Sequence, residues 1–189
     1  MFGFFKKRKL KSLLQKNKRH RAFLNMEAIR SVLILFETSD YDIVDSFIGG
    51  LLGMGKYVDG YAFRVKDDNF DYSETNYTIV GPKENSEKSG APDKELLRQL
   101  KSRRYDVVID LTIKENFSLQ YVLASADATM TVGLKKNNLR LYDFSILRLN
   151  QTKGAKNKQV EELITAIVFY LKTIKDTRYE GRNVGPLFS

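Results

Sequence analysis

The stretch Tyr105–Leu111, YDVVIDL, constrains the fold more than any other part of the chain. Its apolar run, Val107–Leu111 interrupted by Asp110, is too short for a helix and rich in β-branched side chains. It therefore predicts a strand buried on both faces, and such strands belong to parallel sheets covered by helices. Asp110 and Thr112 stand at the end of this strand, where open α/β sheets bind their ligands.

A second buried strand is predicted at Ser31–Glu37, SVLILFE, and a polar turn and an amphipathic helix follow it directly. Short apolar runs and helical patterns continue to alternate as far as Gly133, which is typical of βα units joined by right-handed crossovers. The sequence therefore predicts an α/β fold, a three-layer Rossmann-like domain with a mostly parallel sheet, over residues 29–176. An edge strand within 139–149 and a long amphipathic helix over 160–174 complete it.

Both ends of the chain are expected to lie outside this domain. Residues 177–189 are predicted to form a C-terminal tail, and residues 1–28 a basic helical extension with a helix over 2–25. The net charge of +9 is concentrated in this extension, because residues 1–30 contain ten Lys or Arg and one acid while the rest of the chain is balanced. The predicted basic patch consists of Lys6, Lys7, Arg8, Lys9, Lys11, Lys16, Lys18, Arg19 and Arg21.

Three interpretations of this extension stay open. The helix packs on the body through its leucines and exposes its cations to solvent, or it lies on an anionic membrane surface with Phe2, Phe4 and Phe5 in the headgroup region. Alternatively, it binds RNA or the ribosome by neutralising phosphates. The expected partner is thus an anionic membrane surface or RNA through residues 1–25, or another protein.

Composition excludes several kinds of site. The chain has no cysteine and one histidine, His20, so disulfides, thiolate metal sites and histidine-based triads are not expected. No glycine-rich loop stands between a predicted strand and its helix, so we expect no dinucleotide cofactor. We also expect no export signal and no membrane span, because the longest late apolar run, 163–171, is too short. These features indicate a cytoplasmic protein, either free or peripheral to the inner membrane.

Two stretches resemble one enzyme family. Tyr105–Gly133, YDVVIDL…VLASADATMTVGL, is similar to the N-terminal Rossmann-like domain of the heptosyltransferase-type (lipopolysaccharide heptosyltransferase family) glycosyltransferases. Thr38–Val44 lies where that family has the turn that carries its proposed catalytic base, so the resemblance implies Asp42 as a candidate for that role. The whole chain also looks like a small uncharacterised bacterial family of about this length.

The chain departs from the glycosyltransferase pattern in three ways. Tyr41 replaces the glycine that precedes the family's catalytic Asp, and Thr112 and Ile113 stand where the family has glutamine and glycine. In addition, those enzymes have two Rossmann-like domains and bind the donor mainly on the second, whereas this chain has the length of one. The resemblance therefore implies half of such an enzyme.

The candidate ligand cleft lies at the carboxyl ends of the two central strands. The carboxylates there are explained by helix capping and by the helix dipole, so no metal is expected. The predicted cleft residues are Thr38, Ser39, Asp42, Asp110 and Thr112.

Three functions follow from these patterns. The favoured one is a non-catalytic, single-domain relative of half of a two-domain (GT-B) glycosyltransferase, which acts as a binding or scaffold protein at the inner face of the membrane. The second is an RNA-associated or ribosome-associated protein that uses the basic helix. The third is a small enzyme that acts on a sugar or a phosphorylated metabolite through the carboxylates of the cleft.

Overall fold

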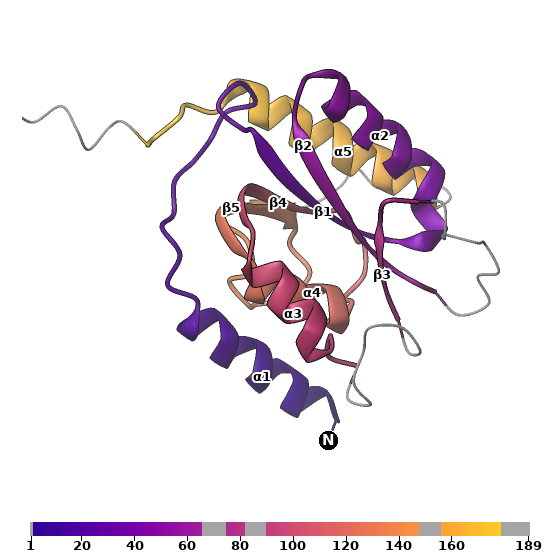
Figure 1. Ribbon diagram of the computed structural model, residues 1–189, viewed down its shortest axis with the longest axis vertical. Coiled ribbons are helices and arrows are strands. Elements are labelled where there is room, and N and C mark those ends of the chain that lie inside the picture. Colours follow the sequence, from indigo (N-terminus) through magenta and orange to yellow (C-terminus); the bar gives the residue numbers. More distant parts are fainter. Residues whose placement is uncertain (1, 66–74, 82–89, 148–155, 179–189) are drawn as a thin grey trace, which may run out of the picture.

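The computed structural model describes residues 2–65, 75–81, 90–147 and 156–178, without the side chains of 2–4 and 156. Within these residues, six strands form one sheet in the order β3-β2-β1-β4-β5-β6, and every neighbouring pair is parallel (Figure 1). The strands are β1 Ser31–Glu37, β2 Tyr57–Phe63, β3 Thr78–Val80, β4 Arg104–Asp110, β5 Asp127–Leu134 and β6 Phe144–Ile146. The predicted Rossmann-like parallel sheet is confirmed.

The two predicted buried strands, β1 and β4, are neighbours at the centre of the sheet. Leu35 of β1 lies opposite Asp110 of β4, and the amide of Leu111 donates to the carbonyl of Leu35 at 2.8 Å. The chain order changes direction between these two strands, so their carboxyl ends form the topological switch point of the sheet. The predicted edge strand is β6, which pairs with the last three residues of β5, Val132–Leu134.

Helices cover both faces of the sheet because successive strand side chains point to opposite sides. On one face, the side chains of Ile34 and Ile109 pack with Val44 of α2 and Leu163 of α5, and on the other, Leu33 and Val108 pack with α3 and α4. Figure 1 shows the resulting layers. The helices after the 3-10 turn η1, Thr38–Asp40, are α2 Tyr41–Gly53, α3 Lys94–Lys101, α4 Phe117–Ser125 and α5 Lys156–Thr173.

The N-terminal helix α1, Phe2–Lys16, adds a further layer outside α4 (Figure 1). Leu10 is buried against Tyr121 and Ala124 of α4, with Leu13 and Leu14 packed at the same contact. The helix ends at Lys16, so the prediction of a helix as far as residue 25 was wrong. A continuing helix could not have buried Leu24, which belongs to the core on the opposite face of the sheet.

Residues 17–30, which we call the strap, run from α1 to β1 without helix and cover the edge of the sheet. The amide of Ala22 donates to the carbonyl of Thr129, which lies in the half of β5 that β6 does not pair with. Arg19 lies beside it, and its guanidinium forms a 2.6 Å ion pair with Asp143 and donates to the carbonyl of Ala128 at 3.0 Å. The strap thus satisfies backbone groups that an edge strand would otherwise expose.

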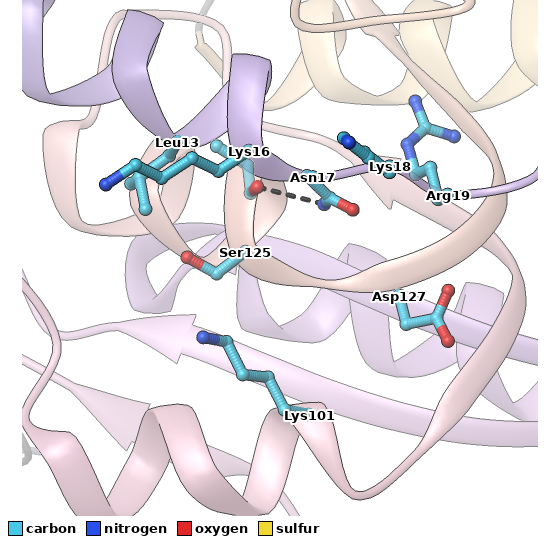
Figure 2. Close-up of a pocket in the computed structure, with 9 residues that line it drawn as sticks. Leu13, Lys16, Asn17, Lys18, Arg19, Lys101, Ser125 and Asp127 are labelled. Atoms are coloured by element: carbon cyan, nitrogen blue, oxygen red, sulfur yellow. Dashed lines mark hydrogen bonds between the residues drawn. The ribbon is translucent and has the colours of Figure 1, made fainter.

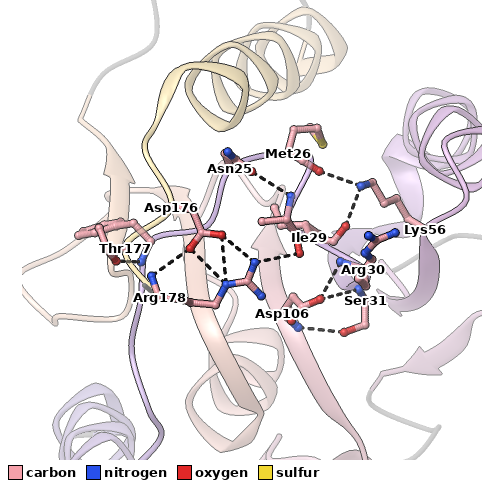
Figure 3. A network of polar contacts seen from close by, with 12 residues as sticks. Asn25, Met26, Ile29, Arg30, Ser31, Lys56, Asp106, Asp176, Thr177 and Arg178 are labelled. Atoms are coloured by element: carbon pink, nitrogen blue, oxygen red, sulfur yellow. Dashed lines mark hydrogen bonds and ion pairs between the residues drawn. The ribbon is translucent and has the colours of Figure 1, made fainter. Parts of the chain in front are cut away.

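The end of the strap is fixed by a second polar network (Figure 3). The Lys56 ammonium donates to the carbonyls of Met26 and Ile29 at 2.8 and 2.7 Å, and the amide of Met26 donates to Leu171 of α5. The Asp106 carboxylate accepts the amide of Arg30 at 2.7 Å. Beyond α5, Thr177 also contacts the strap, because its hydroxyl accepts the amide of Phe23. Of the predicted tail over 177–189, residues 179–189 lie outside the described residues.

Truncation of the Arg19 side chain should cause a large loss of stability, because Arg19 forms a buried ion pair with Asp143. The two side chains are only 6% and 13% exposed, so Arg19→Ala leaves the Asp143 carboxylate buried without its main cation. We expect a loss of about 3–5 kcal/mol of unfolding free energy, measured by urea denaturation.

Arg21 provides the matched control. It lies 3.6 Å from the same carboxylate but is 56% exposed, so Arg21→Ala should cost less than about 1 kcal/mol. Equal losses for the two variants would show that the buried pair does not anchor the strap.

Candidate functional site

The carboxyl end of β4 carries a closed polar network around Asp110. One carboxylate oxygen of Asp110 accepts the backbone amide and the hydroxyl of Thr112 at 2.9 and 2.6 Å. The other accepts the Lys136 ammonium at 2.8 Å and the Tyr142 hydroxyl at 2.7 Å. The side chains of Asp110 and Lys136 are 0% and 4% exposed, so the network is a buried, fully hydrogen-bonded ion pair.

Packing holds Tyr142 in this network. A β-carbon on Gly133 would lie 2.6 Å from the Tyr142 ring, so the glycine provides the space that the ring occupies beside β5. Burial raises the pKa of Tyr142 well above its ordinary value, and the neighbouring Asp110 carboxylate raises it further. The phenol therefore stays protonated and donates to Asp110.

This arrangement assigns Asp110 a structural contact rather than a reactive one. Both of its oxygens are engaged and the carboxylate has no solvent exposure, whereas a general base must reach the proton that it removes. Lys136 and Tyr142 were not predicted from the sequence. The available signal was the pair Lys135–Lys136 after β5, the apolar strand that lies beside the strand ending in Asp110.

The other predicted cleft residues occupy different surroundings. The hydroxyl of Thr38 accepts the amide of Val65 at 3.1 Å, on the β2 side of the switch point. Ser39 of η1 and Asp42 in the first turn of α2 are exposed. Asp110 and Thr112 contact each other directly, and a ligand cleft shared by all five residues stays a prediction. In the described part of the chain, no three acidic or histidine side chains gather closely enough to hold a metal ion.

The residues of the predicted basic patch differ in their exposure and in their contacts. Arg19 is used internally by Asp143, and Lys6 and Lys9 lie over the rings of Phe117 and Tyr121 on α4, at 4.8 and 5.0 Å. His20 is exposed, as are the patch members Lys7, Arg8, Lys9, Lys11, Lys16, Lys18 and Arg21. None of the helices described has the length and apolarity that crossing a bilayer requires.

A hollow of about 380 Å³ lies between the end of α1, the end of α3 and the start of β5 (Figure 2). Lys16, Lys18 and Lys101 line it, with Asp127 as the acidic lining residue. Asn17 closes one side, where its side-chain amide donates to the carbonyls of Ala124 and Ala126 at 3.0 and 2.9 Å and so completes the end of α4. The exposed cations of α1 therefore continue into a basic concave surface.

The described residues thus form a Rossmann-like α/β fold with a parallel six-stranded sheet, and the Asp110 network lies at its switch point. The chain belongs to a family described as "Family of unknown function (DUF6913)", whose model matches residues 3–174. A comparison with curated proteins gave no match.

A comparison with solved structures found similarity to "the glycosyl transferase family 9 from Veillonella parvula DSM 2008", with a TM-score of 0.50 and 16% sequence identity. The similarity covers 82% of this chain and 43% of that one, so this chain spans less than half of the glycosyltransferase. At this identity the likeness shows the fold alone. It confirms the predicted resemblance to a glycosyltransferase half at that level.

The buried ion pair leads to a second stability prediction. Lys136→Met leaves the Asp110 carboxylate buried beside an apolar side chain, and we expect a loss of about 3–5 kcal/mol of unfolding free energy in urea. The double variant Asp110→Asn, Lys136→Met buries no charge and should recover part of that loss. Lys135→Met changes the exposed neighbouring lysine and should stay within about 0.5 kcal/mol of the parent. A Lys136→Met protein as stable as the Lys135→Met control would contradict the structural assignment.

Proposed function

We propose that this protein is a non-catalytic, single-domain relative of one glycosyltransferase half, and that it binds an anionic membrane surface through the α1 side of the molecule. The observation that carries the proposal is the orientation of α1. Its leucines pack on α4, whereas Arg8 lies exposed on the opposite side of the helix and Lys11 lies exposed on its flank.

The basic surface extends beyond the helix. Lys18 follows α1, and Lys101 reaches the same hollow from the end of α3, so cations from two separate elements face one concave surface (Figure 2). Juxtamembrane cations of this kind are each worth about 1 kcal/mol near an anionic lipid surface. The rest of the chain supplies no comparable excess, since its formal charges are balanced outside residues 1–30.

An exposed aromatic residue favours a membrane surface over RNA as the partner. Phe5 is 61% exposed on the same helix as the cations. Helices that lie on a bilayer surface place Phe, like Trp and Leu, at the boundary between headgroups and acyl chains. The leucines of α1 are committed to α4, so binding rests on charge and on this aromatic residue rather than on insertion of the helix. Such binding is reversible and falls as salt is added.

The contacts and surroundings of two carboxylates support the proposed lack of catalysis. Asp110 is held by Lys136 and Tyr142, and Asp42 stands exposed at the start of α2 without the glycine that precedes the corresponding residue of the glycosyltransferase pattern. The similarity to a solved glycosyltransferase covers less than half of that enzyme.

Vesicle sedimentation tests the membrane proposal. The full chain should sediment with vesicles that contain phosphatidylglycerol and not with phosphatidylcholine vesicles. The variant Arg8→Glu, Lys11→Glu, Lys18→Glu should reduce the apparent affinity by about a hundredfold or more, because it replaces three attractive charges by three repulsive ones.

Deletion of residues 1–25 is unsuitable for this test, because it removes most of the strap, including buried Leu24. The matched control is Lys158→Glu, Lys172→Glu, Lys175→Glu, which makes the same change of net charge at exposed positions on or just after α5, across the sheet from α1. Equal loss in both variants contradicts a defined surface. The partner would instead be RNA if the parent protein did not sediment with anionic vesicles but retained RNA until high salt. In that case the variant Arg8→Glu, Lys11→Glu, Lys18→Glu should no longer retain the RNA.

The proposal that the protein is not a glycosyltransferase is tested separately. The full chain is incubated with sugars activated by uridine, guanosine and adenosine diphosphate, and the released nucleotide is measured. We expect release equal to that in buffer, and no change on Asp42→Asn. Nucleotide release that Asp42→Asn abolishes would identify a working catalytic base and contradict the proposal.

A further inference from the structure

A second hollow, of about 290 Å³, lies at the carboxyl edge of the sheet. Its wall is formed by the start of α4, by the loop after β5 and by the first turns of α1, through Phe117, Leu139 and Leu10 respectively. It is thus separate from the basic hollow at the end of α1, and it lies at the edge where open α/β sheets bind ligands. Its volume suits a small metabolite.

Two side-chain amides in this hollow have donors without a partner among the described residues. Gln120 is 3% exposed, and its Nε2 group is buried without a hydrogen bond. The Nδ2 group of Asn137 is in the same state, while the Oδ1 atom of this residue accepts the amide of Leu139 at 2.8 Å. That bond defines which side of the Asn137 amide is the oxygen, so the free group is a donor.

Buried donors of this kind are rare, since most buried polar groups in proteins have a hydrogen-bond partner. Both groups belong to residues that line the same hollow, so one ligand with acceptor oxygens could satisfy both. Neither amide takes part in the network around Asp110 or in the contacts of the strap.

Charge defines the class of acceptor. Lys6 and Lys7 line the hollow from α1, and the Lys6 ammonium lies 4.8 Å from the centre of the Phe117 ring, which holds it at the wall. Two cations and two neutral donors that come from different elements suit a tetrahedral anion with several oxygens better than a planar carboxylate with two. Glu115 is the acidic lining residue, and it can accept a hydroxyl of the ligand.

We propose that this hollow binds the phosphate of a small hydroxylated phosphomonoester, with the Gln120 and Asn137 amides and Lys6 as its donors. This site is independent of the proposed membrane surface, because the exposed cations Arg8, Lys11 and Lys18 do not line it. The same chemistry occurs in a free metabolite such as glycerol 3-phosphate and in the headgroup of phosphatidic acid.

Titration calorimetry with glycerol 3-phosphate and with inorganic phosphate tests the site in the full chain, and sedimentation with phosphatidic acid vesicles tests the lipid form. Gln120→Leu keeps the size of the side chain and removes the donor, and it should weaken phosphate binding by about ten- to a hundredfold. A merely structural role predicts unchanged binding, and higher thermal stability, because the substitution removes an unsatisfied buried amide.

Ser125→Ala is the matched control. The Ser125 hydroxyl is also buried without a partner, but it lines the other hollow, so this variant should bind phosphate like the parent. The variant Arg8→Glu, Lys11→Glu, Lys18→Glu should also keep its affinity for glycerol 3-phosphate.

Loss of binding in Gln120→Leu supports the site. A loss seen by calorimetry identifies a free phosphate compound as the ligand, and a loss seen by vesicle sedimentation identifies the lipid phosphate. Absence of phosphate binding in both arms overturns the proposal, as does binding that Gln120→Leu leaves unchanged.

Discussion

A buried guanidinium must be neutralised and hydrogen-bonded where it lies, and this requirement at Arg19 determines how the N-terminal region packs. Its partners belong to β5 and to the loop before β6, so the ion pair with Asp143 joins the strap to the open edge of the sheet. Because the strap is held there, α1 reaches α4, and Leu24 reaches the core on the other face of the sheet. The basic segment is therefore an integral part of the packing of the domain.

The surface chemistry of the molecule follows from that packing. With Leu10 and its neighbours buried on α4, α1 presents a charged outer face, and its first turns form one wall of the hollow that contains Gln120 and Asn137. In the two proposals, the same helix contributes to anion binding on two scales, through an extended outer surface and through a small hollow beneath it. Asp110, which lies deeper, is left to neutralise Lys136.

Local patterns predicted the fold well, because buried strands and amphipathic helices depend on neighbouring residues. Strand β1 begins and ends where its apolar run predicts. The strap was not predictable in this way. Arg19 and Asp143 are far apart in the sequence, and a basic run with regularly spaced leucines looks helical until its tertiary partners are known. The partners of Asp110 were missed for the same reason, since Lys136 and Tyr142 follow it by 26 and 32 residues.

The central claim is that the strap is part of the folded sheet, and hydrogen exchange measured residue by residue tests it most directly. The amides of Ala22 and Met26 donate to Thr129 and Leu171, so they should be protected to nearly the same degree as the amides of β5. Exchange of these two amides at the rate of an unstructured chain, while β5 stays protected, would show that the N-terminal region is a loose appendage and would contradict the account.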